Sequence, residues 1–119
     1  MEINNLTKFK IDRKSFAQVA KKVLMGENKG IQSVSLALVG VAEMQKLNNK
    51  FRGKNKPTDV LSFGDINEVV ICPEVVQEKS EDIKKVFIHG ILHILGYDHE
   101  KSKEEAELMR QKEEFYAKG

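Results

Sequence analysis

Three histidines within eleven residues constrain this chain more than any other feature of its sequence. His89, His93 and His99 are the only histidines among the 119 residues, and all lie in the segment HGILHILGYDH, residues 89–99. The apolar residues around the first two predict a helix buried in the middle of the domain. Because His89 and His93 are four residues apart, a helix places both side chains on one face. Gly96 can form the left-handed turn that ends this helix, and His99 can then swing back toward the other two.

Three imidazoles brought together in this way predict a metal site. A single histidine on an apolar helix is more often a hydrogen-bonded core residue, but three buried together without a shared partner would leave several polar groups unsatisfied. Imidazole nitrogen suits zinc, although the sequence leaves copper, nickel and iron open. Three protein ligands leave the fourth tetrahedral position for water, which is typical of catalytic rather than structural zinc. We therefore expect one zinc ion held by His89, His93 and His99.

The spacing of the histidines also matches the long zinc motif of metzincin proteases, H-E-x-x-H-x-x-G-x-x-H, with one exception. The protease motif places its general-base Glu directly after the first His, where this chain has Gly90. Glycine cannot take a proton from a zinc-bound water, so peptide hydrolysis by that route is disfavoured. A metallopeptidase is therefore the less favoured alternative.

Composition indicates one small domain, residues 1–119. This length is enough for one core, and 40% hydrophobic with 32% charged residues is ordinary for a soluble globular protein. We expect no membrane association, because no apolar run approaches the length of a membrane span and the amino-terminal segment lacks a signal-peptide core. The single cysteine, Cys72, excludes an internal disulfide and favours a reducing, cytoplasmic location. A formal net charge of +2 does not by itself indicate a nucleic-acid partner.

The residue pattern predicts an α+β domain with a small mixed sheet and helices around a central metal-bearing helix. Asp12 and Ser80 are the expected N-caps of the first helix and of the histidine helix, and Ser102 with Glu105 predicts a capping box for the last one. Residues 73–79 allow a further brief helix, because proline is favoured at the first helical position. Strands are expected at residues 1–6, 32–39, 58–63 and 68–72, and the other helices at residues 12–26, 41–51 and 102–117.

A second feature is a lysine-rich loop, residues 46–63, expected to follow the short second helix. Gly53 and Pro57 keep this segment out of regular structure. A solvated surface loop explains such a run of charge as well as a phosphate-binding patch does. In the second interpretation the lysines supply charge and Arg52 supplies a bidentate fork for phosphate. Five positive charges fall within eleven residues before the first acid, Asp59: Lys46, Lys50, Arg52, Lys54 and Lys56.

Two separated stretches of the chain resemble one family. FRGKNKPTDVLSF and HGILHILGYDH are similar to segments of the YbeY family, the bacterial endoribonucleases that mature ribosomal RNA, and they occur in the same order. LNNKF and VVICPEVV also fit, so the resemblance extends from about residue 47 to residue 99. It implies a small zincin-like α+β domain, zinc ligands at His89, His93 and His99, and a functional arginine at Arg52.

The resemblance also implies an activity and its partners. It predicts a zinc-dependent endoribonuclease for single-stranded RNA, acting in 16S rRNA 3′-end maturation and in ribosome quality control, with ribosomal RNA and the ribosome or its small subunit as partners. Arg52 would neutralise the phosphate, while Lys54 and Lys56 would hold the flanking backbone. Asp98 is expected to orient one of the histidine ligands without binding the metal itself. The alternative is a non-catalytic ribosome-assembly factor whose metal only stabilises the fold.

Two departures from the family pattern lie between the two central strands. The connection, residues 64–67, is shorter than the family usually has. Asn67 and Glu68 stand where the family commonly has a glycine followed by an acid, and Asp65 is an alternative position for that acid. The short connection affects any contact that this loop makes with the substrate, but it does not affect the metal site.

Overall fold

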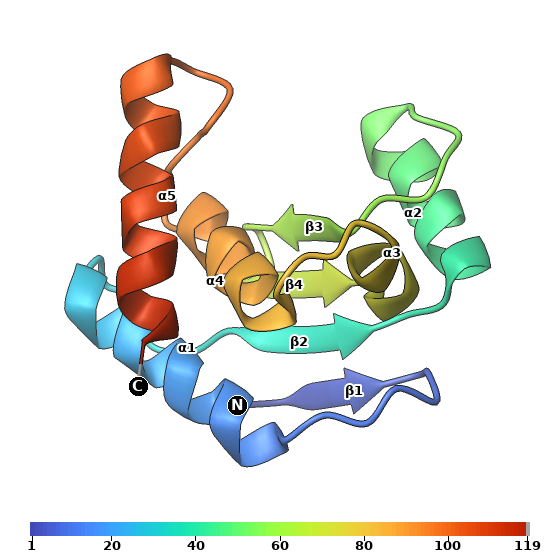
Figure 1. Ribbon diagram of the computed structural model, residues 1–119, viewed down its shortest axis with the longest axis horizontal. Coiled ribbons are helices and arrows are strands. Elements are labelled where there is room, and N and C mark those ends of the chain that lie inside the picture. Colours follow the sequence, from blue (N-terminus) through green and yellow to red (C-terminus); the bar gives the residue numbers. More distant parts are fainter. Residues whose placement is uncertain (119) are drawn as a thin grey trace.

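A four-stranded mixed sheet forms the centre of the computed structural model, which describes residues 1–118 (Figure 1). Two strands run parallel to β2, namely β1 and β4, and β3 pairs with β4 in the antiparallel sense. The expected α+β class and mixed sheet are confirmed. The strands are β1 (Ile3–Asn5), β2 (Ser35–Leu38), β3 (Val60–Phe63) and β4 (Glu68–Ile71), in the spatial order β1-β2-β4-β3.

Five helices surround this sheet within residues 1–118, one of them the brief helix that the proline at position 73 allowed. The first and last begin as predicted. The carboxylate of Asp12 accepts the N–H of Ser15 at 3.2 Å, and the hydroxyl of Ser102 accepts the N–H of Glu105 at 3.0 Å. The helices are α1 (Arg13–Glu27), α2 (Val41–Arg52), α3 (Pro73–Glu78), α4 (Ile83–Ile94) and α5 (Lys103–Ala117).

The predicted N-cap of the histidine helix is wrong by two residues. Helix α4 begins after Asp82, whose carboxylate accepts the N–H of Lys84 at 2.9 Å. Ser80 instead has a φ of +56°, and it forms the left-handed turn that leaves α3. Asp82 and not Ser80 caps α4, because Asp82 has the extended backbone that an N-cap needs, with φ −84° and ψ 116°, whereas the backbone of Ser80 is left-handed.

The two faces of the sheet bury separate sets of side chains, because successive residues of a strand point to opposite sides. Leu36 and Val69 belong to the larger core, which is formed with α1, α4 and α5. Ala37 and Val70 belong to the smaller core, where they pack with Met44 of α2. Figure 1 shows α4 lying across the sheet with α5 beside it. The histidine helix is therefore enclosed by the larger core on its apolar side.

Helix α4 is as deeply buried as its sequence predicts. Phe87, Ile88 and Ile91 are fully buried, and the ring of Phe87 packs against that of Phe16 on α1 with centroids 5.3 Å apart. Burying each large apolar side chain contributes about 1.5–3 kcal/mol. These contacts fix the orientation of the helix that carries His89 and His93.

Gly90 lets α4 approach β4 closely. A methyl group at this position would lie 2.6 Å from Cγ1 of Val69 and 3.2 Å from Oγ of Ser62. The Ser62 hydroxyl also donates a hydrogen bond to the carbonyl of Gly90 at 2.8 Å. Position 90 therefore faces the sheet, and the glycine found there in place of a glutamate has a packing reason.

Cys72 is fully buried after β4, as expected of a thiol that follows an apolar strand. Its N–H donates to the carbonyl of Asp59 at 2.9 Å, which joins the end of β4 to the segment before β3. Within residues 1–118, no helix is both long and apolar enough to cross a membrane.

Replacing Gly90 by alanine should destabilise the protein, although alanine is the better helix former. The gain in helix propensity is about 1 kcal/mol, whereas an extra methyl group in a packed core costs about 1–3 kcal/mol. Because Val69 is fully buried and short, it has little room to move. We expect the free energy of unfolding, measured by urea denaturation, to fall by about 1 kcal/mol. Gly64→Ala is the control, because that position has open space around it. Unchanged stability of G90A would contradict the close approach.

Candidate metal centre

Helix α4 and the turn after it bring the three histidines together. His89 and His93 lie on successive turns of α4, and His99 lies between α4 and α5. Nε2 of His93 is 3.1 Å from Nε2 of His89 and 2.9 Å from Nδ1 of His99. The ligand atoms that the three residues offer all lie within 4.8 Å of one another, so they could hold a metal ion.

The turn between α4 and His99 has the geometry that its glycine predicts. Gly96 has a φ of +106°, which places it in the conformational region that favours glycine. Its N–H donates to the carbonyl of His93, and the N–H of Tyr97 donates to the carbonyl of Leu92, each at 3.0 Å. These two bonds close the helix end and reverse the chain toward His99.

A different acid from the expected one contacts the histidine cluster. Nδ1 of His89 lies 2.7 Å from Oε2 of Glu113 on α5. Asp98 instead accepts the N–H of Glu100 at 2.9 Å and so shapes the turn. The prediction that Asp98 orients a histidine is therefore wrong. A carboxylate at Nδ1 makes that nitrogen the N–H donor of His89, which directs the lone pair of Nε2 into the cluster.

Sequence reasoning missed Glu113 because it is one acid among many on a charged helix. The available signal was its position. Glu113 lies four residues after Met109 and three before Tyr116, the two buried residues of α5. It therefore shares the inward face of that helix.

The nitrogen contacts fit a shared cation better than a hydrogen-bonded cluster. A ring nitrogen offers either one N–H or one lone pair, so Nε2 of His93 cannot satisfy both of its close contacts with hydrogen bonds. Three lone pairs around one cation satisfy all of them, and zinc–nitrogen bonds of about 2.0–2.1 Å would place tetrahedral ligands about 3.3 Å apart. Burial, and after it the neighbouring charges of His89 and His99, lower the pKa of His93, which keeps its lone pair free at neutral pH. The residues present fit a metal.

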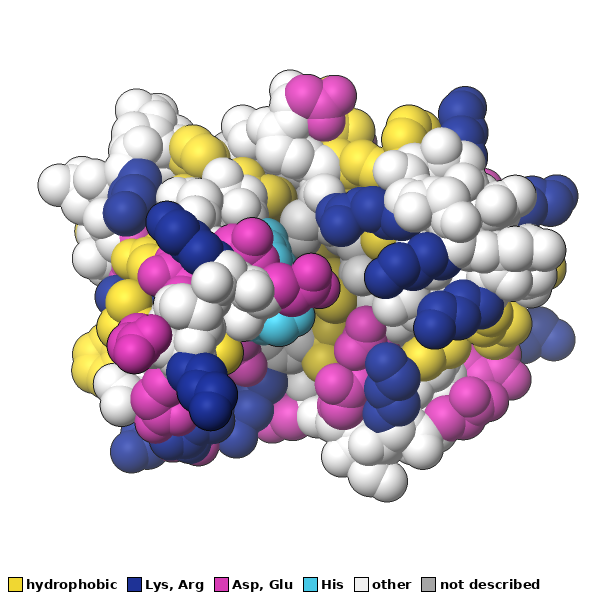
Figure 2. All heavy atoms as spheres, turned by 90° about the horizontal axis from the view of Figure 1, so that it is seen from above, with side chains coloured by type: hydrophobic (Ala, Val, Ile, Leu, Met, Phe, Trp, Pro, Cys, Tyr) yellow, Lys and Arg dark blue, Asp and Glu magenta, His cyan; other side chains and the backbone are white. Residues whose placement is uncertain are grey.

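A groove of about 1020 Å³ adjoins the histidines. One wall carries the three histidines and Glu113, and Lys and Arg side chains gather on the wall that faces them (Figure 2). The predicted phosphate-binding residues all line this groove: Arg52, Lys54 and Lys56. The structure thus brings the two sequence features together in one space.

Polar side chains of α2 hold the basic wall in place. Asn48 is buried, and its Nδ2 donates to the carbonyl of Lys56 at 2.8 Å. Gln45 donates from Nε2 to Oδ1 of Asn55 at 3.1 Å. Sequence reasoning missed Asn48, because an asparagine near a helix end gives no sign of whether it is buried. The bonds to α2 make the basic segment an ordered part of the fold.

The helix predicted at residues 41–51 is confirmed, and it takes up the first part of the lysine-rich segment, residues 46–63. Residues 46–52 form the last turns of α2, which ends at Gly53, where φ is +68°. The helix continues because none of these residues breaks it before the glycine. Lys46 and Lys50 are not among the residues that line the groove.

The short connection between β3 and β4 is a turn closed by a residue with positive φ. Asn67 has a φ of +51°, a conformation in which asparagine is the commonest substitute for glycine. Glu68 accepts a hydrogen bond from the hydroxyl of Ser35 at 3.1 Å, which ties β4 to β2. Neither Glu68 nor Asp65 lines the groove.

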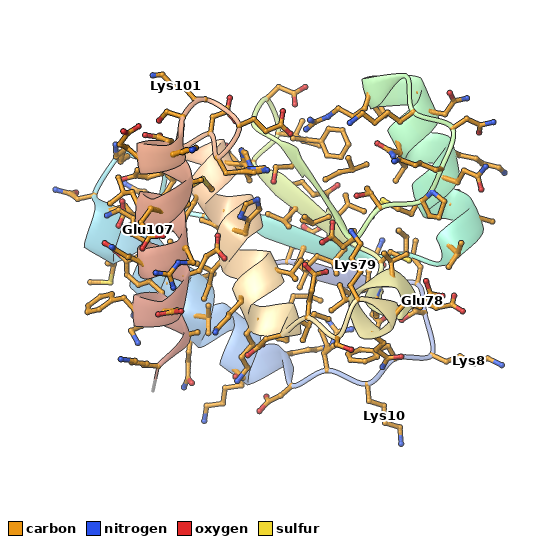
Figure 3. The ribbon with its side chains drawn as sticks, turned by 45° about the horizontal axis from the view of Figure 1, so that its top comes forward. Lys8, Lys10, Glu78, Lys79, Lys101 and Glu107 are labelled. Atoms are coloured by element: carbon orange, nitrogen blue, oxygen red, sulfur yellow. The ribbon has the colours of Figure 1, made fainter. Side chains whose placement is uncertain are left out.

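A pair of carboxyl groups, Asp59 and Glu81, lines the groove near Lys79. Figure 3 shows Lys79 beside the end of α3, and its Nζ lies 3.8 Å from Oδ2 of Asp59. Burial, together with the hydrogen bond and charge of Asp59, raises the pKa of Glu81 to about 7. Burial opposes ionisation of Asp59 too, but the hydrogen bond from Glu81 and the charge of Lys79 lower its pKa. The pair therefore shares one proton below neutral pH.

The shared proton predicts a pH-dependent effect of Glu81→Gln. Glu81 holds its proton more tightly when folded than at its ordinary pKa of 4.5, so its stabilising contribution is present at acidic pH and is lost as pH rises through about 7. E81Q should gain stability relative to wild type as the pH rises from 4.5 to about 7, by less than about 1 kcal/mol because solvent screens a partly exposed group. Urea denaturation across this range measures the gain, with Glu78→Gln as the control, because Glu78 does not line the groove. A difference that does not vary with pH would contradict the shared proton.

Comparison with known proteins relates the whole chain to one family. The family model described as Endoribonuclease YbeY matches residues 2–119. A protein named Endoribonuclease YbeY from Bdellovibrio bacteriovorus is 41% identical over 99 residues, which cover 72% of this chain and 65% of the relative. Its namesake from Petrotoga mobilis is 36% identical, with 96% of this chain and 90% of the relative covered. The matched region thus spans about two thirds of the first relative and most of the second.

A solved structure agrees with the sequence matches. The solution structure of a protein from Thermotoga maritima is 32% identical, has a TM-score of 0.59, and covers 96% of this chain and 85% of that one. The family match includes the three histidines and also the basic segment, which lies across the groove from them. The chain belongs to the Endoribonuclease YbeY family.

Proposed function

We propose that this protein is a zinc-dependent endoribonuclease that cuts single-stranded RNA in the groove beside the three histidines. The observation that carries the proposal is the convergence of the histidine nitrogens opposite Arg52, Lys54 and Lys56. Groups suited to a cation and groups suited to phosphate therefore face the same space. The name shared by the relatives, Endoribonuclease YbeY, supports the same activity.

The proposed cofactor is one zinc ion bound by His89, His93 and His99. Three imidazole nitrogens, one of them backed by the carboxylate of Glu113, are a ligand set typical of catalytic zinc. When bound, zinc supplies a Lewis acid and a water of lowered pKa. Helix α4 is then the metal-bearing helix of a zincin-like domain, and its buried face holds two of the ligands in place.

Residues of the groove do the remaining work. Arg52 binds the phosphate at the cut and stabilises the negative charge that develops on its oxygens. Lys54 and Lys56 bind flanking phosphates as point charges, without reading sequence. Because Asn48 fixes their loop, these groups are positioned before RNA arrives, which lowers the entropic cost of binding.

The proposed substrate is ribosomal RNA. The proposal extends to a role in 16S rRNA 3′-end maturation and in ribosome quality control, with the small ribosomal subunit as partner and the cytoplasm as location. Membership of the Endoribonuclease YbeY family supports the RNA-cutting part of it. Phosphate contacts alone do not select a site, so the ribosomal context would direct the cut. The chain would act as a single domain, residues 1–119, of which residue 119 lies outside the described residues.

Peptide hydrolysis is disfavoured by packing as well as by residue type. Position 90, where the protease motif has its glutamate, faces Val69, and even a methyl group would lie too close to that side chain. A base placed there would disrupt the contact between α4 and the sheet. The metallopeptidase alternative therefore lacks its proton acceptor.

Metal removal should abolish RNA cleavage. The test compares wild type, chelated wild type, chelated protein with zinc restored, and His89→Ala on a labelled single-stranded fragment from the 3′ end of 16S rRNA. We expect cutting only by wild type and by the restored sample, because the three histidines act as one ligand set. Equal cutting by all four samples would indicate a contaminating ribonuclease. Cutting by none, with all samples folded, would favour the non-catalytic assembly factor.

Arg52→Ala should separate metal binding from catalysis. The variant should keep the zinc content of wild type, whereas its cleavage rate should fall about 10²–10³-fold, the usual effect of removing one donor to a developing negative charge. Arg52→Lys should recover only part of the rate, because lysine cannot make the bidentate contact. The control is Arg110→Ala, at an exposed arginine of α5 outside the groove. Normal cleavage by R52A would refute the role given to Arg52.

A further inference from the structure

A buried carboxylate outside the groove is linked to the turn that carries His99. Glu27 is the last residue of α1, and its side chain is only 3% exposed. Its carboxylate accepts hydrogen bonds from the hydroxyl of Tyr97 at 2.6 Å and from Nζ of Lys112 at 3.1 Å. The hydroxyl of Tyr116 donates a third hydrogen bond to the same carboxylate. Three separate segments, α1, the turn before His99 and α5, therefore meet at one charged group.

This network is of the kind that resists rearrangement. Burial opposes ionisation of Glu27, but the hydrogen bonds from Tyr116, Tyr97 and Lys112 hold its pKa below its ordinary value. A buried charge that loses a partner keeps its desolvation penalty, so breaking one of these bonds is costly. The turn residue bound to this carboxylate is therefore firmly held.

Tyr97 is that turn residue, and it lies between the glycine that ends α4 and the third histidine. Gly96 comes before it with positive φ, and His99 follows two residues later with a side chain 42% exposed. Two ammonium groups also lie over the ring of Tyr97, Nζ of Lys29 at 5.0 Å and Nζ of Lys112 at 5.5 Å from its centroid. Tyr97 is thus the anchored point from which the backbone runs to the third histidine.

The third histidine needs such an anchor more than the other two. His89 and His93 are fixed by the rigid helix α4, whereas His99 lies outside any helix. Ordering a turn residue at the moment of metal binding costs backbone entropy. A turn that is already ordered avoids this cost, so the metal binds more tightly.

We propose that Glu27, acting through Tyr97, positions His99 and thereby sets the metal affinity of the centre. The inference rests on the proposed function in one respect, the role of His99 as a ligand. Tyr116 provides a matched reference, because its hydroxyl binds the same carboxylate but belongs to α5 and not to the ligand turn. Its ring packs against Gly26, where an added methyl group would lie 2.5 Å from the hydroxyl oxygen, so α5 stays docked through this contact when the hydroxyl is removed.

The test compares Tyr97→Phe with Tyr116→Phe, each of which removes one hydroxyl donor from Glu27. Zinc affinity is measured by competition with a chromophoric chelator, cobalt substitution reports the ligand geometry by visible absorption, and urea denaturation of the metal-free protein reports stability. We expect Y97F to weaken zinc binding about tenfold, near the lower end of the effects seen when groups behind metal ligands are removed. Its cobalt spectrum should also change. Y116F should keep wild-type affinity and spectrum while losing a similar amount of stability.

Further variants make the outcomes decisive. Glu27→Gln should weaken zinc binding in the same direction as Y97F, because it removes the charge that holds the tyrosine. Unchanged zinc affinity in Y97F would overturn the inference. Equal losses of zinc affinity in Y97F and Y116F, in proportion to their losses of stability, would also overturn it. His99→Ala gives the affinity of a centre without its third ligand. If wild type binds zinc no better than H99A does, the role of His99 and this inference are both overturned. If cleavage depends on zinc but Y97F binds zinc as tightly as wild type, only this inference is overturned.

Discussion

The close contact between α4 and β4 at Gly90 is the constraint on which the site depends. It lets the apolar face of α4 seat against Val69 while the opposite face turns His89 and His93 toward the groove. Strand β3, paired with β4, also touches α4 through the hydrogen bond from Ser62 to Gly90. Because the basic segment leads directly into β3, the same contact sets how far the basic wall stands from the histidines. If helix α4 lay further from the sheet, the histidines would also lie further from the basic wall.

The groove brings together an acidic cluster beside the histidines and a basic cluster around Arg52, which the net charge of +2 conceals. Asp98, Glu100 and Glu113 lie with the histidines, whereas Arg52 and its neighbouring lysines lie opposite. Carboxylates at short range repel phosphate, and the repulsion is strongest where water is partly excluded. A divalent cation on the histidine wall offsets that repulsion. Under the proposed function, the metal therefore matters for admitting RNA to the groove as well as for the chemistry.

The parts of the site that follow local periodicity could be predicted from the sequence. The spacing of His89 and His93, the glycine turn and the order of strands and helices all depend on near neighbours in the chain, and the structure agrees with them. Helical spacing places Glu113 on the inward face of α5, but the partners of Glu113 and Asn48 could not be found in this way, because they lie 24 and 8 residues away and meet these side chains only after the fold forms. The N-cap of α4 failed for a different reason, since two acceptors stood close together and only the backbone geometry decides between them.

Two buried or half-buried acids support the histidine cluster from opposite sides, Glu113 of α5 through His89 and Glu27 of α1 through Tyr97. Each acts before any ligand arrives, so each lowers the cost of assembling the centre. By thermodynamic linkage, contacts that strengthen metal binding are themselves strengthened by the metal. A bound ion would therefore tighten the docking of α1 and α5 on α4, although it touches neither α1 nor the sheet. Under the proposed function, the centre would then serve the fold as well as the reaction, so a loss of activity after metal removal has to be separated from a loss of structure by measuring both.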